Sequence, residues 1–155
     1  MEFKDMQTTK KGDYGECLVD EYYIHNGYTP YAPTIEGAHT IDRMYCKKST
    51  TDIFIADIKA KPFRNSYPDT GLNTKHYNEY ISASLKLGVE VRLIFVDEKM
   101  GRMYGNTLTN LMKYAEFGIH SYPWEHGKQT YFLLSSMKKM RDLTLDEIEK
   151  LRSFK

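Results

Sequence analysis

The sequence predicts an α/β fold in which a mixed central β-sheet is flanked by helices. Two runs of alternating or β-branched apolar residues, Thr40 to Cys46 and Thr51 to Ala60, are separated by four polar residues, which indicates a β-hairpin. Apolar residues recur at helical spacing over 11–26 before the hairpin and over 74–87 after it. An apolar run over 89–96 then indicates a central strand. Elements in this order build a sheet covered by helices.

The first helix is predicted over 11–26, where Asn26-Gly27 supplies the stop signal. The next segment, 28–35, contains Pro30 and Pro33, so we expect an edge strand or a loop that leads into the hairpin. After the hairpin, the turn-forming residues of 62–73 predict a loop of about twelve residues, long enough to favour a functional role.

The remaining elements follow from the same signals. The second helix spans 74–87 and ends at Gly88, and the strand over 89–96 turns through 97–101 into a strand over 102–105. We expect a helix over 107–117, a loop over 120–127 and a short strand over 129–134. Thr144 and Glu147 form a capping-box pattern that opens a last helix, which continues to Phe154.

Length and composition favour one domain over 1–155, because 155 residues with 41% hydrophobic content are enough to bury a core. The formal net charge of +1 does not identify a partner. Cys17 and Cys46 lack the spacing of a metal or redox site and suggest a reduced compartment. No apolar stretch reaches the roughly 18 residues of a membrane span, so we expect a cytoplasmic protein with no membrane partner.

An acid and a lysine share one face of the second hairpin strand. Strand alternation places Asp57 and Lys59 on the side of Ile53 and Ile55, and Asp42 lies on the partner strand. Two carboxylates beside one ammonium repel each other unless a cation joins them. Mg²⁺ or Mn²⁺ would suit two carboxylates and a backbone carbonyl, whereas the alternative is an ordinary ion pair of Lys59 with either acid.

Asp42 together with Asp57-Ile58-Lys59 resembles the signature of the PD-(D/E)xK nuclease superfamily, which includes restriction-endonuclease-like and Holliday-junction-resolvase-like proteins. Ile41 stands where that signature has proline. The resemblance implies an αβββαβ core over Lys11 to Gly105, followed by a C-terminal helical addition. It also implies that Asp42, Asp57 and the Ile58 carbonyl hold Mg²⁺ or Mn²⁺, and that Lys59 orients or helps to deprotonate the attacking water.

Further site residues are expected near this cluster. By the same resemblance Glu16, on the first helix, binds a second metal ion or the water, although a solvent-facing ion pair explains its position as well. His39 is either a ligand or a surface residue. His76 and Tyr80 lie on one helical face and resemble a Gln-x-x-x-Tyr motif of some related nucleases; a rim histidine and a core tyrosine are the alternative.

Nucleic acid is the expected partner. We expect Lys61, Arg64 and Lys75 on the DNA backbone, with Arg64 best suited to a phosphate because its planar fork matches phosphate oxygens. Each of the three cations is otherwise an ordinary exposed charge. Tyr122 with Trp124 would either stack on a base or close the core.

The function that the resemblance implies is metal-dependent hydrolysis of phosphodiester bonds that leaves a 5′-phosphate. DNA is favoured over RNA as the substrate, although the sequence does not decide between them. A non-catalytic nucleic-acid or protein binder on the same fold, for example an inhibitor or assembly factor, is the alternative. A small-molecule hydrolase has no Ser-His or Cys-His motif to support it. A homodimer is a hypothesis, because a small nuclease often needs a second copy to cut two strands.

Overall fold

The computed structural model describes residues 6–35, 39–113, 119–121 and 128–154, and its central feature is a six-stranded sheet of order β1-β2-β3-β5-β6-β9. Only β3 and β5 run parallel; the other neighbours are antiparallel. A second sheet has the order β4-β8-β7. The helices are α1 (Gln7–His25), α2 (Thr74–Leu87), α3 (Leu108–Met112) and α4 (Leu145–Ser153), with a 3-10 turn at Leu134–Ser136. The strands are β1 (Tyr28–Tyr31), β2 (Arg43–Lys47), β3 (Ile53–Ala60), β4 (Asp69–Asn73), β5 (Glu90–Asp97), β6 (Arg102–Thr107), β7 (Ile119–Ser121), β8 (Lys128–Leu133) and β9 (Lys138–Asp142).

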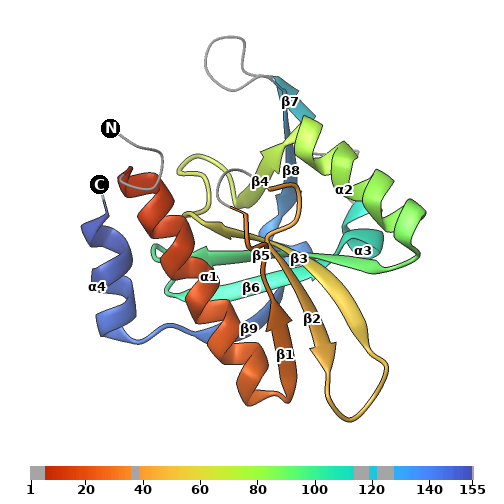
Figure 1. The fold of residues 1–155 in the computed structure, drawn as a ribbon. Coiled ribbons are helices and arrows are strands. Elements are labelled where there is room, and N and C mark those ends of the chain that lie inside the picture. Colours follow the sequence, from red (N-terminus) through yellow and green to blue (C-terminus); the bar gives the residue numbers. More distant parts are fainter. Residues whose placement is uncertain (1–5, 36–38, 114–118, 122–127, 155) are drawn as a thin grey trace.

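The predicted α/β class and hairpin are confirmed. β2 and β3 pair antiparallel with Met44 opposite Ile55, although β2 begins at Arg43 and not at Thr40. β1 is an edge strand, as Pro30 predicts, because a proline has no amide hydrogen to donate to a second neighbour. Helices α1 and α4 lie on one side of the central sheet and α2 and α3 on the other (Figure 1).

Each face of the central sheet has its own core, and β3 contributes to both. Phe54, Ala56 and Ile58 lie in the core beneath α1 and α4, whereas Ile55 lies in the core beneath α2 and α3. This alternation is the one that the sequence predicts for a strand. It directs Asp57 and Lys59, two and four residues after Ile55, to the α2 side.

Helix α1 packs against β3 at a glycine. A Cβ atom built on Gly15 would lie 2.7 Å from the Cβ of Ala60, which is closer than two carbon atoms approach without displacement. The helix therefore comes close to the end of β3 that carries Lys59. Three residues earlier on the same helix, Gly12 has no atom within 4 Å of such a Cβ.

Local signals account for the ends of two helices. The Asn73 side chain accepts a hydrogen bond from the Lys75 amide at the start of α2, and Gly88 ends the helix with φ of 63°. At α4, Thr144 and Glu147 form the predicted capping box, although the helix ends at Ser153.

Two sequence predictions are wrong in part. The predicted loop over 62–73 includes strand β4, whose Gly71 would place a Cβ 2.1 Å from the Thr130 carbonyl oxygen of β8. Nor is the C-terminal part a helical addition alone, because β9 joins the central sheet beside β6. The helix predicted over 107–117 is described only as α3, and residues 114–118 lie outside the described residues.

Substituting the two α1 glycines separates packing from helix propensity. We expect Gly15→Ala to lower the free energy of unfolding by about 1–3 kcal/mol, because α1 has to move away from Ala60. Gly12→Ala, the control on the same helix, should raise it by about 0.5–1 kcal/mol, because alanine favours the helix. Urea denaturation of the three proteins measures both effects, and an equal gain in the two variants would show that α1 and β3 are not in close contact.

Candidate active site

Asp42, Asp57 and Lys59 meet where β2 begins and β3 ends. The Lys59 Nζ lies 2.6 Å from Asp57 Oδ1 and 3.9 Å from Asp42 Oδ2. The Ile58 amide donates a 2.8 Å hydrogen bond to Asp42 Oδ2, which fixes this carboxylate against β3. The three residues singled out on the hairpin therefore form one cluster.

Asp57 is the most deeply buried member, with 1% of its surface exposed. Its Oδ1 accepts hydrogen bonds from Lys59 and from the hydroxyl of Tyr80 on α2. Among the described residues, its Oδ2 has no hydrogen-bond partner. A buried carboxylate oxygen without a donor is costly in an apolar core, so this atom calls for a ligand.

The charges of the cluster do not balance. Burial and the neighbouring Asp57 raise the pKa of Asp42 from 3.8 to about 7, although Lys59 and the Ile58 amide act in the opposite direction. Burial lowers the pKa of Lys59, but Asp57 and Asp42 outweigh this effect and raise it. Lys59 is therefore a cation at neutral pH, while the Asp42 carboxyl group is partly protonated.

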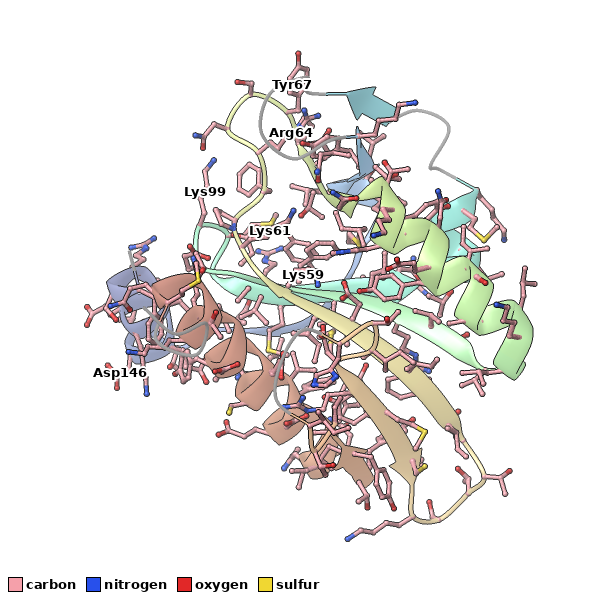
Figure 2. All side chains as sticks on the ribbon, turned by 45° about the horizontal axis from the view of Figure 1, so that its top comes forward. Lys59, Lys61, Arg64, Tyr67, Lys99 and Asp146 are labelled. Atoms are coloured by element: carbon pink, nitrogen blue, oxygen red, sulfur yellow. The ribbon has the colours of Figure 1, made fainter. Side chains whose placement is uncertain are left out.

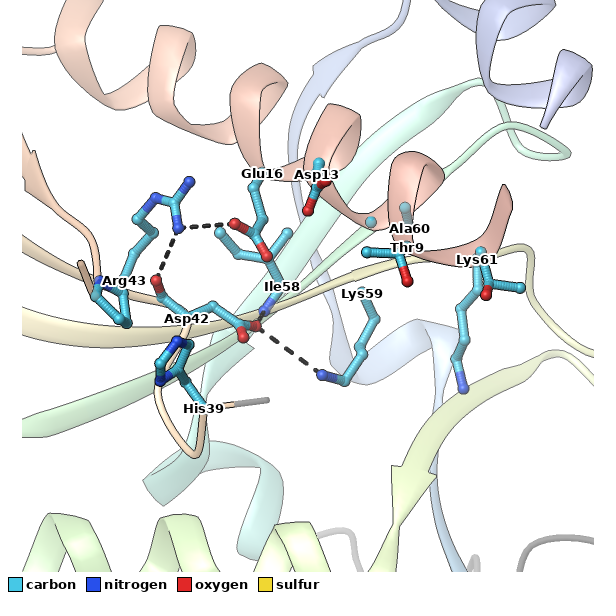
Figure 3. Close-up of a pocket in the computed structure, with 13 residues that line it drawn as sticks. Thr9, Asp13, Glu16, His39, Asp42, Arg43, Ile58, Lys59, Ala60 and Lys61 are labelled. Carbon is cyan, nitrogen blue, oxygen red and sulfur yellow. Dashed lines mark hydrogen bonds and ion pairs between the residues drawn. The ribbon is translucent and has the colours of Figure 1, made fainter. Parts of the chain in front are cut away.

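An open groove of about 530 Å³ leads to the cluster from the surface (Figure 3). One wall is the first half of α1, from Thr8 to Glu16, and the floor is the end of β3 from Ile58 to Lys61. Pro33, His39 and Asp42 form part of the opposite wall. His39 is exposed, and its Nε2 lies 2.5 Å from the Ile35 carbonyl oxygen, so it borders the groove without contacting the carboxylates.

Glu16 lines the groove but contacts an arginine that the sequence analysis did not single out. Arg43 Nη1 lies 2.7 Å from a Glu16 carboxylate oxygen, and Arg43 Nε lies 3.1 Å from Asp20. The same guanidinium donates to the Asp42 backbone carbonyl at 2.8 Å (Figure 3). Burial still raises the pKa of Glu16, with Arg43 opposing it. Arg43 thus ties the α1 acids to the start of β2.

The residues fit a hard divalent cation only in part. Two carboxylates, one with an unsatisfied oxygen, are a donor set that Mg²⁺ accepts when water and substrate oxygens complete its shell. No group of three or more His, Cys, Asp or Glu in the described ranges is arranged to hold a metal ion. Asp42 and Asp57 are therefore the residues that fit a metal ion, whereas the Glu16 carboxylate is paired with Arg43.

Lys61 and Arg64 extend from the cluster along the segment after β3 (Figure 2). Burial, together with the neighbouring Lys59, lowers the pKa of Lys61 to about 8. Arg64 differs from the expectation of a phosphate-facing cation: it pairs with Asp69, and its guanidinium lies 3.7 Å from the Tyr131 ring centroid. A neighbouring cation that the sequence analysis did not assign, Lys99, hydrogen-bonds Asn65 at 2.8 Å.

The α2 residues separate into two groups. Tyr80 reaches Asp57, and burial together with that carboxylate raises the pKa of its hydroxyl. Lys75 and His76 are exposed at the start of α2, and neither is in the groove above the carboxylates. The prediction for Tyr122 and Trp124 concerns residues outside the described ranges.

The raised pKa of Asp42 predicts a stability that depends on pH. An unfolded aspartate loses its proton near pH 3.8, whereas the folded protein keeps it to about pH 7, so the folded state binds the extra proton between these values. This contribution to stability is complete below pH 3.8 and falls as the pH rises to 7. Its slope is at most about 1.4 kcal/mol per pH unit.

Urea denaturation in chelator at several pH values between 4.5 and 7.5 tests this dependence. Asp42→Asn should flatten the decline, because asparagine does not titrate, whereas the exposed control Asp52→Asn should keep it. Identical slopes in the wild type and Asp42→Asn would contradict the assignment.

Comparison with known proteins bears on the fold. No protein-family model matches the chain, and no curated protein sequence matches it. Among solved structures, a Holliday junction resolvase, Hjc, from the archaeal hyperthermophile Archaeoglobus fulgidus superposes with a TM-score of 0.55 at 10% identity, over 81% of this chain and 90% of that one. No described helix is both long and apolar enough to cross a membrane. The chain therefore shares its α/β fold with this resolvase, which confirms the restriction-endonuclease-like fold that the sequence resemblance implies.

Proposed function

We propose that this protein is a divalent-metal-dependent nuclease that hydrolyses phosphodiester bonds in DNA. The observation that carries the proposal is the pair of the buried Asp57 and the half-buried Asp42. One Asp57 oxygen has no donor among the described residues, and the Asp42 carboxyl group has a pKa near 7. A protein that needed only a stable core would be better served by apolar residues here. The fold shared with a resolvase adds support from an independent direction.

In this proposal Asp42, Asp57 and the Ile58 carbonyl hold Mg²⁺ or Mn²⁺. The bound cation would supply a lowered water pKa and positive charge against the scissile phosphate. Lys59 remains protonated because of its two acidic neighbours, so its role is to donate a hydrogen bond to water or to a phosphate oxygen. Release of the 3′-oxygen would leave a 5′-phosphate.

The neighbouring residues would position these groups. Tyr80 holds Asp57 through its hydroxyl, and the Ile58 amide holds Asp42. Glu16 lies in the groove and would hold the water or a second metal ion after exchanging its contact with Arg43. Lys61, half-buried with a lowered pKa, would gain a full charge beside a phosphate.

The substrate proposal rests on cations around the groove and on the name of the resolvase. Lys61 lines the groove, and Arg64 and Lys99 lie along the adjoining segment, so a strand that enters the groove would pass them. Lys75 and His76 would contact DNA only if the strand continued over α2. We also propose a homodimer, because two cuts in a duplex or junction need two active sites; a monomeric mass by light scattering would contradict it.

A second candidate function is a non-catalytic nucleic-acid binder on the same fold. The observation that favours it is that Lys59 and Arg43 already pair with four acids of the site, two for each cation. In addition, no described group of three His, Cys, Asp or Glu residues surrounds a metal position. In that case the cations at the groove would bind nucleic acid and the carboxylates would only hold those cations.

Cleavage assays separate the two candidates. We expect Mg²⁺- or Mn²⁺-dependent cleavage of at least one member of a panel of single-stranded, duplex, flapped and four-way-junction DNAs. Asp57→Asn should lower the rate at least 100-fold, because it removes charge without changing size, and Lys59→Met should do the same by removing the donor.

Asp146→Asn is the matched control, since Asp146 is exposed on α4 far from the cluster (Figure 2). It should cleave at the wild-type rate. RNA versions of the same substrates test the preference for DNA. Wild-type protein that binds these nucleic acids but cuts none of them with either metal would favour the non-catalytic candidate.

Metal binding is measurable without catalysis. We expect 10 mM Mg²⁺ to stabilise the wild type against urea by about 1–2 kcal/mol if the Kd is near 1 mM. Asp57→Asn should lose this gain, because the unsatisfied oxygen is gone, while Asp146→Asn should keep it. Titration calorimetry near pH 6.5 should also record proton release from Asp42 on metal binding, and an equal gain in all three proteins would place the ion elsewhere.

A further inference from the structure

A second groove, of about 460 Å³, lies at the other end of α1. It shares no lining residue with the groove above the carboxylates. Its wall is the last turn of α1, with Tyr22, Tyr23 and Asn26, and its floor crosses the central sheet from β1 and β2 through β5 and β6 to β9. The groove therefore joins both edge strands of the sheet.

Three cations point to the α1 side of the sheet in this groove. Arg92 lies two residues before Ile94, Lys138 two residues before Met140 and Lys47 two residues after Tyr45. Ile94, Met140 and Tyr45 all pack in the core beneath α1 and α4. Strand alternation places each cation on the same face as its neighbour. Lys139 adds a fourth cation to the lining, and the lining includes no Asp or Glu.

The cations differ in how they are held. Arg92 is fixed, with its Nε 2.9 Å from Glu90, a hydrogen bond to the Tyr23 side chain and its guanidinium 3.7 Å from the Phe54 ring centroid. Lys47 and Lys138 have no ion pair among the described residues; Lys47 lies 5.5 Å from the ring centroid of Tyr28. Two acids outside the lining already have partners: Asp52 accepts a hydrogen bond from the Tyr28 hydroxyl, and Asp142 accepts one from Lys139.

The composition of this groove suits a phosphate group. Arg92, Lys47 and Lys138 all bring positive charge to the lining. Glu90, outside the lining, compensates Arg92, whereas neither lysine has an ion pair among the described residues. Tyrosine rings form the rest of the wall, which provides apolar surface for a base or a sugar. The volume is within the usual range for a small-molecule site.

We propose that this groove is a phosphate-binding site, with Lys47, Arg92 and Lys138 as its cationic residues. The phosphate would come from a nucleic-acid strand or from a free nucleotide. The proposal is independent of the nuclease function, because none of the residues belongs to the carboxylate cluster, and it holds for a catalytic or a non-catalytic protein.

The test measures binding in chelator, so that cleavage has no part in it. Inorganic phosphate, dAMP and a twelve-nucleotide single strand are titrated into the full-length protein, and amide chemical shifts are followed by NMR. We expect the largest shifts at Lys47, Arg92 and Lys138. Shifts with dAMP identify a nucleotide site, and shifts with the strand alone identify a nucleic-acid site.

Charge reversal provides the second measurement. Lys47→Glu with Lys138→Glu should lower the affinity for the responding probe at least tenfold, and for the strand it should reduce the salt dependence by about one to two counterions. Lys86→Glu with Lys113→Glu is the control, with the same change of net charge at exposed positions on α2 and next to α3. The proposal is overturned if no probe shifts the groove amides, or if both double variants lose affinity equally.

Discussion

The structure depends on one electrostatic constraint, the burial of Asp57 in the middle of the sheet. A carboxylate with 1% exposure is stable only if donors surround it, and here Lys59 and Tyr80 supply donors to one oxygen. Tyr80 comes from α2, so the position of that helix is coupled to the charge state of β3. Asp42 is coupled to the same strand through the Ile58 amide. The positions of the hairpin, α2 and the groove therefore depend on one buried charge.

A second buried acid holds the segment that leaves β3. Asp97, with 0% exposure, accepts hydrogen bonds from the amides of Phe63, Lys99 and Met100 and from the Tyr104 hydroxyl. Four donors from two distant parts of the chain thus meet at one carboxylate, which has no ion pair among the described residues. This contact determines where Lys61 lies relative to the groove, because Phe63 follows it by two residues. Lys61, a proposed substrate contact, is thus positioned by a side chain that does not line the groove.

The sequence allowed the local features to be predicted, and the structure shows why the others were missed. Strand alternation was sufficient to place Asp57 and Lys59 on one face, and the bounds of α2 followed from its apolar spacing and Gly88. Strand β4 was missed because Gly71 disfavours a strand locally and is required only by the backbone of β8. The contact of Glu16 with Arg43 depends on how α1 lies over β2, a tertiary relation that no spacing in the sequence encodes.

Charge counting explains why the carboxylate cluster differs from a structural ion pair. Lys59 can balance one of the two acids, and the second remains as an excess negative charge. Without a ligand, the protein limits this excess by protonation, which is what a pKa near 7 for Asp42 means. Either a proton or a divalent cation can neutralise this excess negative charge, but only the divalent cation also offers positive charge to a phosphate. The groove is lined by Asp42 and not by Asp57, so a phosphate would approach the cluster from the side of Asp42.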